Sequence, residues 1–278
     1  INGKISDLPV ILSSHVSPEW REYERTSTTV VSAYTSPIII KYLTSLQKSL
    51  KKEGINVPIL IMQSNGGVVS AEFAKKNPVQ TLLSGPVGGT IAGVTVFNEV
   101  KKLSKNGLIC MDMGGTSFDV SIVIDGKAQI ELDSNIDGHD LLAPSVAIHT
   151  IGAGGGSITE FKSGKINVGP ESAGSNPGPV CYDNGGTELT VTDANLILGR
   201  ISKKLSFGNN IKLNYKNTSL KMNELGKKLN LSGNQVAEGI IKIADGNMAN
   251  AVRELTVFRG LDPRDYALMA FGGARAHY

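Results

Sequence analysis

Aromatic residues are scarce in this sequence: one Trp, seven Tyr and seven Phe make up 5% of its 278 residues. So few rings give little support to a protein that stacks nucleic-acid bases or sugars on aromatic platforms. An excess of one charge is lacking too, because 28 Lys and Arg nearly balance 25 Asp and Glu, for a net charge of +3. A charge this small gives no argument for a nucleic-acid partner or for docking on an anionic membrane surface, and we expect neither.

Cysteines and long apolar runs are also missing. The two cysteines, Cys110 and Cys181, make neither a zinc cluster nor a disulfide framework, so we expect a reducing cytoplasm. Apolar runs such as 37–40 and 58–62 are far shorter than the roughly 20 residues of a transmembrane helix. We therefore predict a cytoplasmic protein that neither spans nor binds a membrane.

Glycine, by contrast, is abundant, with 32 residues against about 19 expected at the usual ~7%. Most of these glycines gather in residues 64–93, 112–119, 152–186 and 260–273. Glycines that only served scattered turns would be spread along the chain. Their clustering indicates a few loops with a shared purpose.

The order of periodic segments predicts a mixed-sheet α/β domain. Residues 107–132 are expected to form three consecutive antiparallel strands, with Gly114-Gly115 at the first hairpin and Asp125-Gly126 at the second. Further strands are expected at 58–63, 145–151 and 265–271, and 160–190 is expected to be rich in loops. Helices are expected from the Ser36 N-cap to Gly54, from 84 to about 103, and from 232 to 258.

The sharpest local signal is Asp-Met-Gly-Gly-Thr-Ser-Phe-Asp at 112–119, between two predicted strands. Backbone N–H groups in such a glycine hairpin can form a nest for phosphate oxygens, and Thr116 and Ser117 add hydroxyl groups. Asp112, at the end of the first strand, is placed to hold Mg²⁺ or to position an attacking water. The other interpretation is a purely structural hairpin in which Asp119 accepts hydrogen bonds from turn amides.

A second glycine loop, Gly-Ala-Gly-Gly-Gly-Ser at 152–157, follows the predicted strand 145–151. It is neither a Walker A loop nor a dinucleotide-binding loop, because the spacing of both motifs is absent. It either lets an anion approach the backbone or is simply a flexible loop. His149, just before it, either faces the site as an acid, base or ligand, or is a core histidine bonded to backbone.

Glycine turns follow several predicted strands, at 64–67, 114–117, 152–157 and 272–273. Loops at the carboxyl ends of neighbouring strands meet at one edge of an α/β sheet, where nucleotides bind. We therefore predict that these four loops line one crevice.

Eight motifs together resemble the hydantoinase A/oxoprolinase family, and the likeness covers nearly the whole chain. They are REYERTSTT (21–29), MQSNGG (62–67), SGPVGG (84–89), DMGGTSFD (112–119), HTIGAGGGS (149–157), GPESAG (169–174), PGPVCY (177–182) and TVTDAN (190–195). The resemblance implies the fold of the actin, hexokinase and Hsp70-type ATPases, in which two ribonuclease H-like lobes clasp ATP.

The resemblance also implies roles for parts of the chain. Residues 112–119 look like the second phosphate loop of the ATP clasp, and 270–274 look like the adenosine-contacting strand and turn. The family's first phosphate loop is not found, so 1–278 is expected to be an excerpt of a longer protein. The family continues after Phe-Gly-Gly-Ala with Gly-Pro, whereas this chain has Arg275-Ala276.

ATP and Mg²⁺ are the cofactors that the resemblance implies, for hydrolysis of a five-membered cyclic amide or imide of hydantoin or 5-oxoproline type. A hydantoinase B-type subunit or domain is the implied partner. The catalytic residues are then Asp112, which also binds the metal, and His149. The residues expected at the nucleotide are Gly114, Gly115, Thr116, Ser117, Asp119, Gly154, Gly155, Gly156, Gly272 and Gly273.

Two alternatives share these motifs. One is a carboxylase subunit that uses ATP to activate a ketone and bicarbonate, as in the acetone and acetophenone carboxylases of the same family. The other is a lobe that, by itself, binds nucleotide weakly or not at all and does not turn it over.

Overall fold

The computed structural model describes residues 10–99, 106–136, 138–204, 206–207 and 211–274. These residues divide into two compact units. The first holds the described residues up to Glu99 together with Val123–Ile148, and the second holds the described residues of 100–122 and 149–278. Within the described part of the chain, none of the helices is long and apolar enough to cross a membrane.

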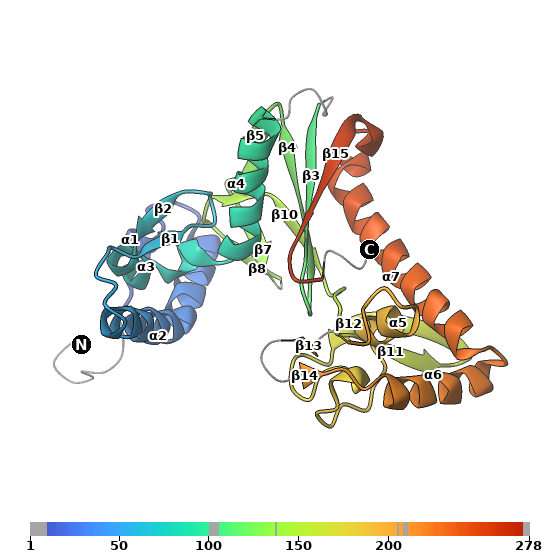
Figure 1. The fold of residues 1–278 in the computed structure, drawn as a ribbon. Helices are drawn as coiled ribbons and strands as arrows, with labels where there is room; N and C mark the ends of the chain where they lie inside the picture. The colour runs from blue at the N-terminus through green and yellow to red at the C-terminus, as the bar shows by residue number, and fades with distance from the viewer. Residues whose placement is uncertain (1–9, 100–105, 137, 205, 208–210, 275–278) are drawn as a thin grey trace. The chain divides into compact units, whose positions relative to one another are not determined.

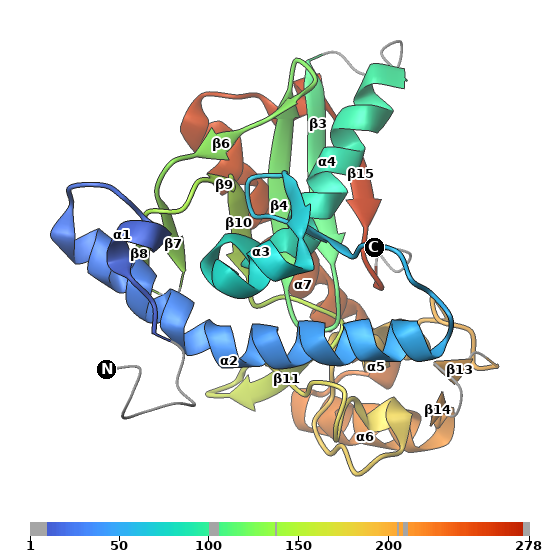
Figure 2. The same ribbon diagram turned by 90° about the vertical axis from the view of Figure 1, so that its left-hand side faces the viewer.

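A 31-residue helix, α2 (Glu22–Lys52), dominates the first unit (Figure 2). The prediction that a helix begins after Ser36 is wrong, because α2 runs through Pro37. Proline removes only one backbone hydrogen bond, whereas the buried face on both sides of it, which includes Thr28 and Leu43, packs against the rest of the unit. The predicted end is confirmed, since Gly54 follows the helix with a φ of +78°.

The first unit also contains three short strand pairs and four further helical segments. The pairs are β1 (Leu60–Met62) with β2 (Val68–Ser70), β6 (Ile130–Glu131) with β9 (Ser145–Val146), and β7 (Ser134–Ile136) with β8 (His139–Leu141). The helical segments are α1 (Ser13–Val16), α3 (Ala71–Lys76), η1 (Pro78–Thr81) and α4 (Ser84–Glu99). The last segment confirms the helix predicted from 84, whose predicted end at about 103 lies outside the described residues.

The main sheet has the order β10-β4-β3-β15 (Figure 1), from β10 (Ile148–Ile151), β4 (Phe118–Ile124), β3 (Gly107–Met113) and β15 (Tyr266–Phe271). β15 runs parallel to β3, from Tyr266 opposite Gly107 to Phe271 opposite Asp112. The predicted mixed sheet is therefore confirmed, and Gly114-Gly115 joins β3 to β4 as predicted.

Two strand predictions need correction. The third antiparallel strand, expected at 127–132, pairs with β4 only over β5 (Lys127–Ala128), and the chain then pairs with β9. The segment 145–151 is likewise not one strand, because β9 and β10 have different partners. At this crossing Ala147 N donates to Gln129 O, at 2.8 Å. Alternating apolar residues look alike in one continuous strand and in two strands that change partner, so the sequence pattern did not reveal the break.

The rest of the second unit builds a separate hydrophobic core. Residues 160–190, expected to be loop-rich, begin with a hairpin of β11 (Ser157–Lys162) and β12 (Lys165–Ser172), so that prediction is wrong up to residue 172 and is confirmed for 173–190. The hairpin packs with α5 (Val191–Ile197) and α7 (Gly233–Leu255), and α6 (Tyr215–Leu229) packs on α7. The predicted long helix is confirmed: Ser232 caps α7, and its apolar face is buried. Short segments complete the unit: η2 (Val180–Tyr182), β13 (Ser206–Phe207), β14 (Ile211–Lys212), η3 (Val257–Arg259) and η4 (Pro263–Asp265).

Candidate functional site

Three of the four glycine loops meet at the end of β3. Gly155 N donates to Gly114 O at 3.1 Å, and Gly156 N donates to Gly115 O at 2.6 Å. Ala274 N, after the Gly272-Gly273 turn, donates to Met113 O at 2.9 Å. These three loops therefore lie together, while the crevice that they are expected to line stays a prediction. The fourth loop, 64–67, belongs to the first unit, where it closes the β1–β2 hairpin.

Several glycines of these loops leave no room for a side chain. A Cβ on Gly154 would lie 2.7 Å from the Gly115 carbonyl carbon, and one on Gly272 would lie 2.3 Å from Asp112 Oδ1. Gly272 also has a φ of +91°, which L-residues rarely adopt. These glycines therefore allow backbone to pack directly on the hairpin and on Asp112.

Asp112 and Asp119 lie on the same face of the sheet. Met111, Met113 and Phe118 line a cavity against α7. Because side chains alternate along a strand, Asp112 and Asp119 project from the opposite face. The two carboxylates therefore stand together beside the hairpin 114–117.

Asp119 is buried and accepts two side-chain hydrogen bonds. Ser117 Oγ donates to Asp119 Oδ2 at 3.1 Å, and Thr150 Oγ1 donates to Asp119 Oδ1 at 2.5 Å. Asp119 therefore links the hairpin to β10, which is the contact that a loop-orienting role requires. It also means that the Ser117 hydroxyl hydrogen already has a protein acceptor.

Burial raises the pKa of Asp112 above its ordinary value, and repulsion from Asp119 raises it further. Two carboxylates on one face of a partly buried site favour a bound cation, because a cation compensates both. Across the described ranges, no group of three or more His, Cys, Asp or Glu could hold a metal ion. Mg²⁺ usually keeps several waters and takes one or two carboxylates together with substrate phosphates, so Asp112 fits Mg²⁺ without a larger cluster.

The loop 152–157 has no free amides to offer a ligand through its three central glycines. Gly154 N donates to Ser157 Oγ at 2.8 Å, while Gly155 and Gly156 donate to the hairpin carbonyls. Its glycines therefore act as a support behind the hairpin. The idea that this loop receives an anion on its own amides does not fit these contacts.

The free amides are found on the hairpin itself. Among the described residues, the N–H groups of Gly115 and Thr116 have no acceptor, and both residues are exposed. A Cβ added at Gly114 or Gly115 would meet nothing within 4 Å, so open space lies beside them. Two exposed donors next to open space form the kind of nest that binds an anion.

His149 is not brought together with the two carboxylates. Thr150 reaches Asp119, so its neighbour His149 projects from the other face of the sheet. There its Nε2 lies 3.0 Å from Glu254 Oε2, on α7. This contact joins β10 to α7, and the geometry gives His149 no direct route to a ligand at Asp112.

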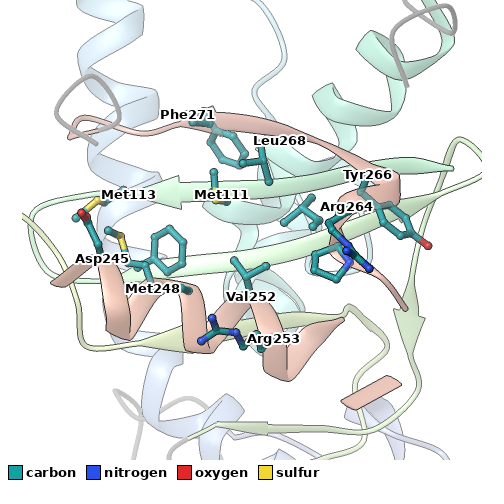
Figure 3. A pocket seen from close by; sticks show the side chains of 15 residues that line it. Met111, Met113, Asp245, Met248, Val252, Arg253, Arg264, Tyr266, Leu268 and Phe271 are labelled. Carbon is teal, nitrogen blue, oxygen red and sulfur yellow. The ribbon is translucent and has the colours of Figure 1, made fainter. Parts of the chain in front are cut away.

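The second unit also contains two large cavities, and residues 114–117 of the hairpin line neither of them. One, of about 630 Å³, lies between α7 and the sheet and is lined mainly by apolar side chains (Figure 3). Asp245 and Arg253 of α7 are among its few charged residues. The other, of about 640 Å³, is more polar and lies between α7 and β12, with Glu171 and Asn247 in its lining. Neither is lined by Asp112 or by residues 114–117.

Three residues of this region were missed by sequence reasoning. Thr150 holds Asp119, Glu254 pairs with His149, and Thr192 donates to Gly155 O. Thr150 and Thr192 lie in the motifs HTIGAGGGS and TVTDAN, so the motifs marked them but gave no role. Each contact joins elements distant in the sequence, and local patterns carry no signal for such pairing.

Three features together define a class of protein. The sheet is mixed, its first hairpin presents free amides beside a carboxylate, and a parallel strand with a glycine turn lies next to that hairpin. This is the ribonuclease H-like lobe of the actin-like ATPase fold. The family profile described as Hydantoinase/oxoprolinase matches residues 25–277, so the chain belongs to the hydantoinase/oxoprolinase family.

Known proteins are similar over nearly the whole chain. The caprolactamase subunit alpha of Pseudomonas jessenii is 37% identical over 99% of this chain, and the 5-oxoprolinase of Saccharomyces cerevisiae is 40% identical over 95%. A nucleotide-free structure of acetone carboxylase, from work on ATP-dependent acetone carboxylation, covers 95% of the chain at 28% identity, with a TM-score of 0.86. The chain spans only 39%, 21% and 37% of these three proteins, respectively.

Proposed function

We propose that the full-length protein hydrolyses a five-membered cyclic amide or imide, of hydantoin or 5-oxoproline type, at the expense of ATP. The chain described here is then its nucleotide-binding core. The observation that carries the proposal is the pair of free amides at Gly115 and Thr116 beside Asp112. Membership of the hydantoinase/oxoprolinase family supports the reaction class.

The chemistry gives a reason to use ATP. A lactam or imide carbonyl is stabilised by resonance, and its nitrogen is a poor leaving group. Phosphorylation of the carbonyl oxygen would give an activated imidate that water can attack. The protein then has to position the reactants and neutralise charge around the transferred phosphoryl group.

Each residue of the hairpin has a proposed task. The N–H groups of Gly115 and Thr116 and the Thr116 hydroxyl would donate to phosphate oxygens, while Asp119 keeps the hairpin in place through Ser117. Asp112 would hold Mg²⁺, which would supply charge neutralisation at the phosphates. The Gly272-Gly273 turn, packed on Asp112, keeps its proposed contact with adenosine.

Titration calorimetry of Mg·ATP, followed by phosphate release with and without a ring substrate, tests the proposal in the full-length protein. We expect micromolar to millimolar binding and phosphate release that rises when hydantoin or 5-oxoproline is added. ATP binding without any ring-dependent phosphate release would contradict the amidase reaction.

A ketone carboxylase is the second candidate, favoured by the structural likeness to acetone carboxylase. It shares the nucleotide chemistry but needs bicarbonate and a ketone. Phosphate release that depends on acetone or acetophenone together with bicarbonate, and not on a cyclic amide, would select it. For either reaction we propose a partner subunit of hydantoinase B type, since caprolactamase subunit alpha is itself named as one subunit.

A further inference from the structure

We propose that Thr192 is a positioning residue that aims the amides of Gly115 and Thr116 at the phosphate. The inference rests on the proposed function and assigns a role to the motif TVTDAN. It follows from a chain of hydrogen bonds that links Thr192, at the start of α5, to the hairpin through two peptide groups.

The first link is a double contact with Gly155. Both the backbone N–H and the hydroxyl of Thr192 donate to Gly155 O, each at 2.7 Å. Thr192 is buried, with 8% of its surface exposed, so these bonds are shielded from water. A Cβ on Gly155 would lie 2.9 Å from Thr192 Oγ1, so the two residues are packed as closely as glycine permits.

The second link passes through the peptide group that joins Gly155 to Gly156. In a trans peptide the C=O and the N–H point in opposite directions within one plane. Here the C=O accepts from Thr192, and the N–H of Gly156 donates to Gly115 O at 2.6 Å. The plane is thus held at both ends, and its orientation depends on Thr192.

The third link is the peptide group that joins Gly115 to Thr116. Its C=O is held by Gly156, so its N–H, which belongs to Thr116, must point away from the supporting loop. The same holds one residue earlier, because Gly155 N binds Gly114 O and thereby turns the Gly115 N–H outward. The direction of both free N–H groups is therefore set by the loop 152–157, which Thr192 holds in place.

Asp193, the next residue, fixes the position of Thr192 itself. It forms a capping box with Thr190 and accepts from Val180 N and Cys181 N at 3.2 and 2.7 Å. These hydrogen bonds fix the start of α5 against η2. The position from which Thr192 donates to Gly155 O is therefore fixed as well. The preorganised direction of donors is what stabilises developing negative charge on a phosphoryl group.

Three variants of the full-length protein test the role. Thr192→Val removes the hydroxyl and keeps the shape, and Thr192→Ser keeps the hydroxyl. Thr218→Val is the matched control, because Thr218 is buried in α6 and its Oγ1 donates to a backbone carbonyl, Asn214 O, at 2.8 Å. Mg·ATP affinity, kcat and KM for ATP, melting temperature and amide hydrogen exchange are measured for each.

For Thr192→Val we expect about tenfold weaker Mg·ATP binding, the scale of one lost hydrogen bond, and faster exchange of the Gly155 and Gly156 amides. We expect Thr192→Ser to stay within about twofold of the parent, and Thr218→Val to lower the melting temperature without changing the affinity. Unchanged exchange at Gly155 and Gly156 in Thr192→Val would overturn the inference, as would an affinity loss of equal size in Thr218→Val. Failure of the parent to bind Mg·ATP would contradict the proposed function, whereas the exchange measurement would still decide the role of Thr192.

Discussion

Single atoms decide what each part of the hairpin can do. The side chains of Asp112 and Asp119 stand on one face of the sheet, and Ser117 is held by Asp119. Gly154 contributes by the absence of a Cβ, which lets its backbone pack against Gly115. At this scale the site consists of the Asp112 carboxyl group with its raised pKa, the two free amides of the hairpin and the backbone contact that supports them.

Asp112→Asn separates a catalytic from a structural aspartate. Since the folded-state pKa of Asp112 lies above the unfolded value, its stabilising contribution is complete only below the unfolded pKa and is lost as the pH rises through the folded pKa. At pH 7 the ionised carboxyl therefore disfavours folding, so the variant should melt at the parent temperature or above it. The ATP-driven rate should fall by orders of magnitude, because the proposed ligand of Mg²⁺ would be lost.

Differential scanning calorimetry and kcat measurements check this, with Asp119→Asn as the control. That control should melt at a lower temperature, because Asp119 accepts from two hydroxyl groups. A lower melting temperature with normal turnover in Asp112→Asn would mean that the aspartate is structural.

Gly154→Ala tests the backbone contact behind the hairpin. The new Cβ would meet Gly115 and Thr116 backbone atoms at 2.7 Å, and backbone cannot move aside as a flexible side chain can. We expect the free energy of unfolding to fall by about 1–3 kcal/mol, as for other overpacked sites. Gly239→Ala, in α7 with nothing within 4 Å, is the control and should be neutral or stabilising. Urea denaturation measures the free energy of unfolding of both variants. Equal values for Gly154→Ala and Gly239→Ala would contradict the close contact at Gly154.

Packing decides where helices and strands of this chain begin and end as much as the local sequence pattern does. α2 continues through a proline that normally begins a helix, and β9 and β10 divide an apparently continuous strand. By contrast, α7 begins at its predicted cap, Ser232, although it ends at Leu255, before the predicted end at 258. Local signals therefore suffice where a cap and a helical period coincide, as at the start of α7, and they fail where packing overrides them, as in α2 and at the break between β9 and β10.

Pro37→Ala measures what the proline costs α2. Alanine would restore a backbone N–H able to bond Ala33 O and would remove the clash of the ring with that turn. Pro37 is exposed, so no core contact is lost. We expect the free energy of unfolding to rise by about 1–3 kcal/mol, measured by urea denaturation. A loss of stability would show that the packing of α2 depends on a distortion at Pro37.

On the scale of the whole molecule, the second unit offers different places for a ligand. The hairpin end carries the polar nest, whereas the 630 Å³ cavity between α7 and β3 is apolar and lies on the opposite face (Figure 3). Apolar cavities with a few polar groups are often ligand sites, so the choice needs a measurement. Phosphate chemistry favours the hairpin, because the free amides of Gly115 and Thr116 stand there beside the carboxylate of Asp112.

Hydrogen exchange of the full-length protein, with and without Mg·ATP, can distinguish the two places. We expect protection at 112–119 and 272–274, because bound phosphate and adenosine would shield these backbones. Peptides covering 245–253 of α7, which line the apolar cavity, should exchange at the same rate with and without nucleotide. Protection confined to 245–253 would place the nucleotide in the cavity and contradict the assignment of the hairpin.

The sequence by itself determined the class of fold, the family and the location of the glycine hairpin 114–117. These follow from local patterns: a glycine pair between two apolar strands, motifs in a family order, and a capped amphipathic helix. Such features are encoded within a few neighbouring residues, so they can be read without knowing what packs against them.

Only the tertiary structure decided which residues of the glycine loops can act. It showed that the amides of 154–156 are occupied, that His149 faces Glu254, and that Thr192 supports the hairpin. In the sequence both 112–119 and 152–157 are candidates for binding an anion, with 112–119 as the sharper signal. Which amides stay free depends on hydrogen bonds between segments dozens of residues apart, and those bonds exist only once the sheet and α5 have packed together.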